Sequence, residues 1–293
     1  MNKNGLILID KPASVTSFAA LGRIKRALGT TKIGHTGTLD PFATGLLVVL
    51  AGSYTRLADL VTGLDKRYQA VVRFGVATDT LDCDGRQTAQ CDPPTEQRLC
   101  EVIQRFVGVL QQQPPAYSAL KIGGTRAYKL ARSGVAVEVA ARTVQVFELR
   151  LLSYQASLAC IDIHCSKGTY IRSLARDIAE ACGSCAHVQQ LNRTSVGPFQ
   201  LRHAVRVEDF DSRRDLWSAD RFINTVPGVQ VLTVSRTAAE RVAHGTALRV
   251  RDITAGSLQA GTCALLDEDH NLLAIADYDG QGFRYRCVLR GAG

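Results

Sequence analysis

GHTGTLDPFATGLL, residues 34–47, combines a turn-rich segment with the start of an apolar run. Glycine and proline are too dense in Gly34–Pro41 for a helix or a strand, so we expect a loop there. The apolar run Leu46–Leu50 predicts buried structure directly after it. Loops anchored beside buried structure often carry function. Taken alone, the position of Asp40 before Pro41 favours a turn-capping residue.

Upstream of this loop, the pattern predicts a strand over Leu6–Ile9 and then an amphipathic helix. Ser17 is the expected N-cap and Gly29 suits the helix end. The expected inward stripe consists of Phe18, Leu21, Ile24 and Leu28, with Arg23, Lys25 and Arg26 on a basic outer face.

Downstream, the pattern predicts further strands and helices. Tyr68–Phe74 predicts a strand, and Val144–Leu151 with Leu158–Cys165 predicts a strand pair. A helical face is formed by Leu99, Val102, Ile103, Phe106 and Val107. A second helix is expected over Tyr170–Ala181, with Ile171, Leu174 and Ile178 inward and Arg172 and Arg176 outside. Short apolar runs after about residue 230 predict a small β-rich domain, and the polar segment Asp211–Asp220 predicts a surface connection.

Composition places the chain among soluble globular proteins, and its charge favours a phosphate-rich partner. The 293 residues are 46% hydrophobic and carry a net charge of +8. Clustered basic side chains release counterions when they bind nucleic acid, although a generic basic surface fits the charge equally well. No apolar run is long enough to span a bilayer, and the nine scattered cysteines are expected to be reduced thiols. These features predict a cytoplasmic protein with no membrane association.

Several cofactor and metal motifs fail on inspection. Cys182 and Cys185 have the C-x-x-C spacing of half a zinc site, but no second pair accompanies them. The run Asp79–Gly85 resembles a calcium loop with the wrong residues at the first and last ligand positions. Phosphate-binding, dinucleotide-binding, serine hydrolase and zinc protease signatures are absent from the sequence. We therefore expect an enzyme that needs no cofactor and no metal.

The stretch Gly34–Leu47 closely resembles the catalytic signature of the TruB family, the tRNA pseudouridine-55 synthases that modify the T loop. Six further blocks resemble the same family in the same order: LIDKP (8–12), DKRY (65–68), TDTLDCDG (78–85), PAYSALK (115–121), SKGTYIR (166–172) and AHVQQLNR (186–193). Residues after about 200 resemble the family only loosely.

This resemblance assigns roles to individual residues. It implies that Asp40 is the catalytic carboxylate, that Arg172 pairs with it, and that Tyr68 stacks on the target uracil and assists proton removal from C5. It also implies substrate contacts from Tyr170, Leu191 and His35, with His35 entering the T loop. Lys11 is expected to position backbone and RNA, and Asp79 lies in a block near the active site. Whether Asp40 attacks the base or acts at the sugar is left open.

The resemblance also implies the fold and the substrate. We expect an α+β pseudouridine synthase domain over 1–228, built on a mainly antiparallel mixed sheet flanked by helices, with an RNA-contacting insertion at about 111–142. A small β-rich PUA-like domain is expected over 229–293. The expected substrate is the T arm of tRNA, bound by a monomer without an obligate protein partner. Two alternatives are a guide-dependent synthase acting on another RNA and an RNA-binding module that does not catalyse.

Overall fold

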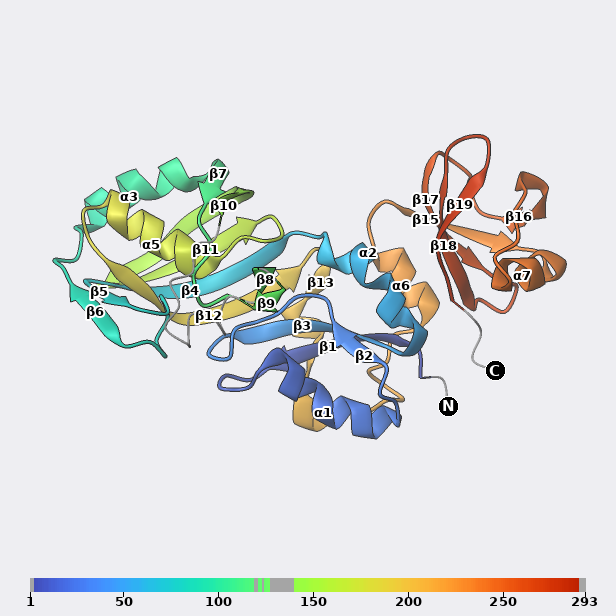
Figure 1. Cartoon of the computed structure of the whole chain (residues 1–293), viewed down its shortest axis with the longest axis horizontal. Coiled ribbons are helices and arrows are strands. Elements are labelled where there is room, and N and C mark those ends of the chain that lie inside the picture. Colours follow the sequence, from blue (N-terminus) through green and yellow to red (C-terminus); the bar gives the residue numbers. More distant parts are fainter. Residues whose placement is uncertain (1–2, 119–120, 123, 127–139, 290–293) are drawn as a thin grey trace.

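Two β-sheets organise the protein, and the computed structural model describes them within residues 3–118, 121–122, 124–126 and 140–289 (Figure 1). The larger sheet has ten strands: β1 (Gly5–Lys11), β2 (Ile33–His35), β3 (Thr44–Ala51), β4 (Lys66–Phe74), β7 (Gly108–Gln112), β10 (Arg142–Gln155), β11 (Leu158–Cys165), β12 (Ala186–Val196), β13 (Phe199–Gln200) and β14 (Val205–Arg206). Its order is β14-β1-β3-β12-β4-β11-β10-β7, with β13 beside β12 and β2 beside β3. Most neighbours are antiparallel, whereas β1–β14 and β3–β12 are parallel. The expected α+β fold with a mainly antiparallel mixed sheet is confirmed.

The second sheet is formed by the strands that follow the larger sheet in the sequence, in the β-rich last part of the chain. Its order is β16-β15-β17-β18-β19, formed by β15 (Val229–Val234), β16 (Ile253–Ala255), β17 (Gly261–Leu266), β18 (Leu272–Tyr278) and β19 (Phe283–Val288). Two small hairpins stand outside the sheets, β5 (Val76–Thr78) with β6 (Gln87–Gln90) and β8 (Lys121–Ile122) with β9 (Thr125–Arg126).

Six α-helices cover these sheets within the described residues: α1 (Ser17–Leu28), α2 (Ala58–Thr62), α3 (Glu96–Ile103), α5 (Ile171–Ala181), α6 (Ala219–Thr225) and α7 (Arg236–Ala243). Short 3-10 helices occupy Gly52–Leu57, Gln104–Phe106, Leu201–His203, Val207–Asp209 and Val250–Asp252. None of the helices in these parts of the chain is long and apolar enough to cross a membrane.

Strands β1 and β3 are apolar at nearly every position because both of their faces are buried. Ile7 and Leu47 pack with α1, whereas Leu8 and Leu46 face the opposite core, which also contains α6. Successive side chains of a strand point to opposite faces, so a continuous apolar run is required when helices cover both. In Figure 1, α1 lies beside β1 and β3, while α3 and α5 lie together over the other half of the sheet.

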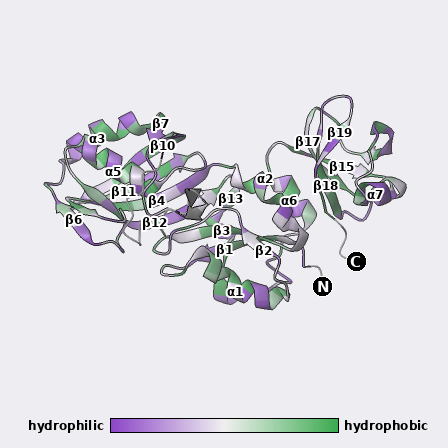
Figure 2. Ribbon diagram, viewed as in Figure 1, coloured by the Kyte–Doolittle hydropathy of each residue, from purple (hydrophilic) through white to green (hydrophobic). Residues whose placement is uncertain are grey.

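Several helix predictions need correction. Thr16, not Ser17, is the N-cap of α1, because its side chain accepts a hydrogen bond from the Ala19 N–H. Gly29 ends the helix in the left-handed conformation, as expected. The inward side consists of Ser17, Ala20, Leu21, Ile24 and Leu28, so Phe18 falls outside it and is 70% exposed. Figure 2 shows the mixture of hydrophilic and hydrophobic residues along α1.

Two further differences concern the middle of the chain. Helix α3 ends at Ile103, and the edge strand β7, which the sequence did not predict, begins at Gly108. On α5 the prediction of an outward Arg172 is wrong, since that residue is 4% exposed, whereas Ile171, Leu174 and Ile178 are buried as expected. Much of the insertion predicted at about 111–142 lies outside the described residues.

The prediction that all nine cysteines are free thiols is wrong for one pair. Cys91 and Cys185 form a disulfide, with their Cα atoms 5.8 Å apart. The main chain brings them together, because the Cys91 N–H donates to the Gly75 carbonyl and the Gly75 N–H donates to the Cys185 carbonyl. Sequence spacing could not reveal this pair, whose members lie 94 residues apart.

Candidate active site

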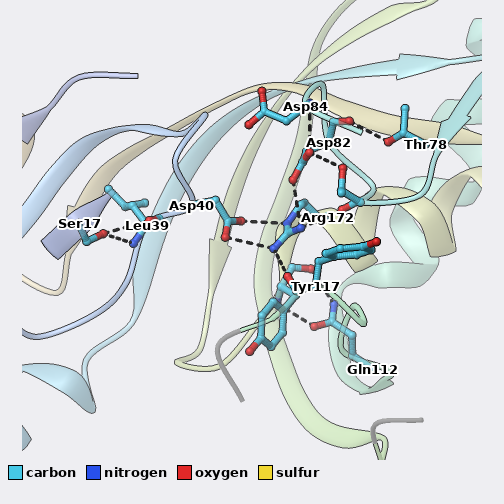
Figure 3. Close-up of polar contacts among 11 residues, drawn as sticks. Ser17, Leu39, Asp40, Thr78, Asp82, Asp84, Gln112, Tyr117 and Arg172 are labelled. Atoms are coloured by element: carbon cyan, nitrogen blue, oxygen red, sulfur yellow. Dashed lines mark hydrogen bonds and ion pairs between the residues drawn. The ribbon is translucent and has the colours of Figure 1, made fainter. Parts of the chain in front are cut away.

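Asp40 lies on the loop between β2 and β3, where it forms an ion pair with Arg172 at the start of α5 (Figure 3). Arg172 Nη2 donates to Asp40 Oδ1 at 3.1 Å, and Arg172 Nε lies 2.9 Å from Oδ2. Both carboxylate oxygens therefore face one guanidinium edge, the geometry that fixes a carboxylate most firmly. The Arg172 side chain is 4% exposed, whereas that of Asp40 remains 33% exposed.

A second carboxylate holds the other edge of the same guanidinium. Arg172 Nη1 donates to Asp82 Oδ2 at 3.0 Å and to the Thr80 carbonyl at 2.8 Å. Arg172 Nη2 also donates to the Tyr117 carbonyl at 3.0 Å. Asp82 Oδ1 in turn accepts from Thr80 Oγ1 and from the Asp84 N–H. The Asp82 carboxylate and the carbonyls of Thr80 and Tyr117 thus set the orientation of the buried guanidinium toward Asp40.

The surroundings of Asp40 move its pKa in opposite directions. Burial raises the pKa of Asp40 above its ordinary value, and the Asp82 carboxylate adds to that rise. The Arg172 guanidinium opposes it by favouring the charged form. The net direction is upward, so Asp40 takes up a proton at a higher pH than an exposed aspartate.

The loop carrying Asp40 is fixed at three points. Ser17 Oγ accepts from the Leu39 N–H at 2.9 Å and donates to the Leu39 carbonyl at 3.0 Å. Arg193 Nη2 donates to the Gly37 carbonyl at 3.0 Å. Lys11 Nζ donates to the Pro41 carbonyl at 3.1 Å. These contacts come from α1, β12 and β1, so three separate elements position one loop.

Gly45 allows the strand after the loop to lie against β12. Its φ is +98°, and a Cβ atom there would lie 2.2 Å from Asn192 Oδ1 and 2.5 Å from the Arg193 carbonyl. Only glycine fits a position with this φ and this close an approach. The last glycine of the signature is therefore required for β3 to reach β12 beside Asp40.

A cavity of about 830 Å³ opens in front of Asp40. Its wall includes Tyr68 from β4, Tyr170 before α5 and Leu191 from β12. The charged lining residues are Asp40, Lys66, Arg142, Lys167, Arg172 and Arg193. This volume lies within the usual range for small-molecule sites, and five cations against one carboxylate favour an anionic ligand.

Family comparisons agree with the geometry. Residues 25–171 match the model of the TruB family pseudouridylate synthase N-terminal domain, and residues 172–224 match that of the tRNA pseudouridylate synthase B C-terminal domain. The chain belongs to the TruB family. It is therefore a pseudouridine synthase, an enzyme of the isomerase class.

Relatives of this TruB-family chain include curated bacterial proteins and solved structures. The tRNA pseudouridine synthase B of Borreliella burgdorferi is 46% identical over 210 residues, which are 71% of this chain and 74% of the relative. That of Bordetella avium is 44% identical over 228 residues, covering 76% and 93%. The fold matches a chain in the structure of an H/ACA RNP bound to a substrate RNA containing 2'-deoxyuridine, with a TM-score of 0.72 and 22% identity over 98% of this chain and 86% of that chain.

The structure brings together five of the predicted site residues. Asp40, Tyr68, Tyr170, Arg172 and Leu191 all line the cavity. Burial raises the pKa of both tyrosines, which keeps their hydroxyl groups protonated near neutral pH.

His35 and Lys11 lie apart from that lining. His35 ends β2, next to the lining residue Thr36, and its Nδ1 is buried without a hydrogen-bond partner among the described residues. Burial lowers the pKa of His35, so its ring is neutral near pH 7. Lys11 is fully buried, and its Nζ donates to the carbonyls of Pro12, Val15 and Pro41.

Two residues of this TruB-family site were not singled out from the sequence. Asp82, rather than Asp79, is the second carboxylate at the ion pair, because Asp79 instead accepts from the Arg86 N–H in the neighbouring turn. Arg193 is 2% exposed and joins Gly37 to Leu46 through its guanidinium. Both lie in sequence blocks that resemble the family. The sequence alone does not distinguish Asp82 from the two neighbouring aspartates, and it does not distinguish Arg193 from an ordinary arginine in a strand.

Proposed function

We propose that this pseudouridine synthase isomerises a uridine of tRNA, the T-loop uridine at position 55. The ion pair between Asp40 and buried Arg172 in the lining of the cavity of about 830 Å³ carries this proposal. Support for tRNA comes from relatives named tRNA pseudouridine synthase B at 44–46% identity. The target uridine must leave its stack to enter the cavity, and loops make this less costly than duplexes.

The reaction conserves the atoms of the nucleotide. The bond between N1 and C1′ breaks, the uracil turns, and a bond forms between C5 and C1′; C5 then loses its proton and N1 gains one. The Asp40 carboxylate serves either as the nucleophile or as the stabiliser of positive charge at the sugar. Both routes require an ionised carboxylate at a fixed place, which the Arg172 pair supplies.

Tyr68 and Leu191 would hold the uracil while it turns. Tyr68 lies on β4 opposite Arg193 of β12, and both residues line the cavity. Base–aromatic stacking contributes about 1–3 kcal/mol, comparable with the cost of flipping a nucleotide. Tyr68 would also lie close to C5 of the bound uracil, where it would assist removal of the C5 proton. The cationic residues Arg142 and Lys167, which also line the cavity, would contact RNA phosphates.

The test is tritium release from an unmodified tRNA transcript labelled at uridine C5, using the purified chain alone. Wild type is expected to release about one label per tRNA, mapped to position 55, while Asp40→Asn binds the transcript but releases none. Turnover by Asp40→Asn would exclude the mechanism, and release mapped elsewhere would exclude the T-loop target. Activity of the purified chain would also support action without a partner protein.

A further inference from the structure

The outer side of α1 exposes an aromatic ring to solvent. Phe18 is 70% exposed, although it belongs to a helix whose other large apolar side chains are buried. Lys25 Nζ lies 4.4 Å from the centroid of the Phe18 ring. A cation over an exposed ring is only weakly held, so the ring face is readily made available to another planar group.

One turn after Phe18, on the same side of α1, Gly22 leaves the helix backbone without a side chain. Gly22 occupies the middle of α1, where glycine weakens a helix relative to alanine. Among the described residues, a Cβ at this position would meet only Arg26 Nη1, at 4.0 Å. Packing inside the protein therefore does not require glycine here, whereas the close approach of a ligand to the backbone would.

The stretch of sequence that contains α1 carries only positive charge, whereas the 3-10 helix Val207–Asp209, which packs against α1, contributes Glu208 and Asp209. Between Asp10 and Asp40 the sequence contains Lys11, Arg23, Lys25, Arg26 and Lys32 and no acidic residue. Lys25 and Arg26 share a helix side with Phe18 and Gly22, because residues three, four, seven and eight apart lie on one face. This α1 face, defined as Phe18, Gly22, Lys25 and Arg26, combines an aromatic ring, a position without a side chain and two cationic side chains.

The α1 face begins next to the active site. Ser17 precedes Phe18 and forms two hydrogen bonds with Leu39, the neighbour of Asp40 (Figure 3). The N-terminal end of α1 therefore lies against the loop that carries Asp40.

We propose that the α1 face binds an unpaired nucleotide of the substrate RNA, outside the cavity that receives the target uridine. The base stacks on Phe18, its backbone lies over Gly22, and Lys25 moves from the ring to a phosphate beside Arg26. Stacking on an aromatic ring is stronger than an exposed cation–ring contact, so the exchange favours binding. This inference rests on the proposed RNA substrate and adds a second contact point to it.

The experiment measures the affinity of unmodified tRNA transcript for single variants, together with tritium release. Phe18→Ala is expected to weaken binding roughly tenfold and to raise KM by a similar factor, while Phe18→Trp retains the affinity of wild type. Gly22→Ala should raise Tm yet weaken binding, a combination that a structural role does not produce. Lys25→Gln and Arg26→Gln should each lower the slope of log affinity against log salt by about one.

Val109→Ala is the matched control, because Val109 is also an exposed apolar residue, 68% accessible, but lies on the edge strand β7. Equal affinity of Phe18→Ala and wild type for the transcript would overturn the proposal, as would equal losses in the Val109 variant. Failure of the proposed function looks different: wild type would then release no tritium from the transcript, whatever the affinity of the Phe18 variants. Failure of wild type to bind the transcript would overturn both.

Discussion

At the scale of single residues, Asp82 controls how firmly Arg172 is directed at Asp40. Asp82→Asn keeps a hydrogen-bond acceptor but removes the charge that faces Nη1 at 3.0 Å. Because a small misplacement of a catalytic group lowers rates strongly, we expect kcat to fall about 100-fold while RNA affinity changes little. Tritium release and transcript binding measure the two effects, with Asp79→Asn as the control from the same turn. A variant with wild-type kcat would contradict this role.

The same residues predict a pH dependence. Protonation removes the carboxylate function of Asp40, so kcat/KM must fall as pH decreases through the pKa of this group. Burial raises that pKa, and the acid limb is therefore expected above the ordinary aspartate value of about 3.9. Because the Asp82 charge contributes to the rise, Asp82→Asn should move the acid limb to lower pH. An acid limb that stays in place in this variant would show that the two carboxylates are not coupled.

At the scale of elements, two adjacent residues at the start of α1 are expected to affect stability and activity separately. Thr16 caps the helix by accepting from the Ala19 N–H, whereas Ser17 bonds to the catalytic loop at Leu39. Thr16→Ala should lower the free energy of unfolding by about 1 kcal/mol with little loss of turnover. Ser17→Ala should lower turnover more than Thr16→Ala does, because the loop loses one of its three points of attachment. Thermal denaturation and tritium release on both variants compare them directly, and the reverse pattern would contradict these assignments.

Elements also show what the sequence could and could not predict. Strand β1 contains a continuous apolar run and helix α5 has strong helical periodicity, so the sequence predicts a strand over Leu6–Ile9 and a helix over Tyr170–Ala181. Phe18 was placed inward because it extends the apolar series of α1, but Ala20 and Leu21 form the buried row. Choosing Asp82 over Asp79 required the fold, because only the contact with Arg172, 90 residues away in sequence, distinguishes them.

At the scale of the molecule, the two sheets share one apolar core. Phe222 and Ile223 of α6 belong to the same buried cluster as Ala264, Leu266 and Ile275 of the second sheet. Division of the chain into domains 1–228 and 229–293 remains a proposal, and this shared core limits how independent such domains can be. The side chains of α6 that face the second sheet would meet water if that sheet were absent.

Truncation after residue 228 tests this point. The shortened chain should unfold at a clearly lower temperature than the full chain, because burial of apolar surface contributes roughly 25 cal/mol per Å² and α6 loses its cover. The cavity, its lining and the Asp40–Arg172 pair all lie before residue 200, so residual turnover should persist at low temperature. Circular dichroism melting, together with tritium release measured at about 15 °C and at about 37 °C, distinguishes these effects. An unchanged melting temperature would show that 1–228 folds on its own, and loss of turnover at every temperature would show that the second sheet contributes to catalysis.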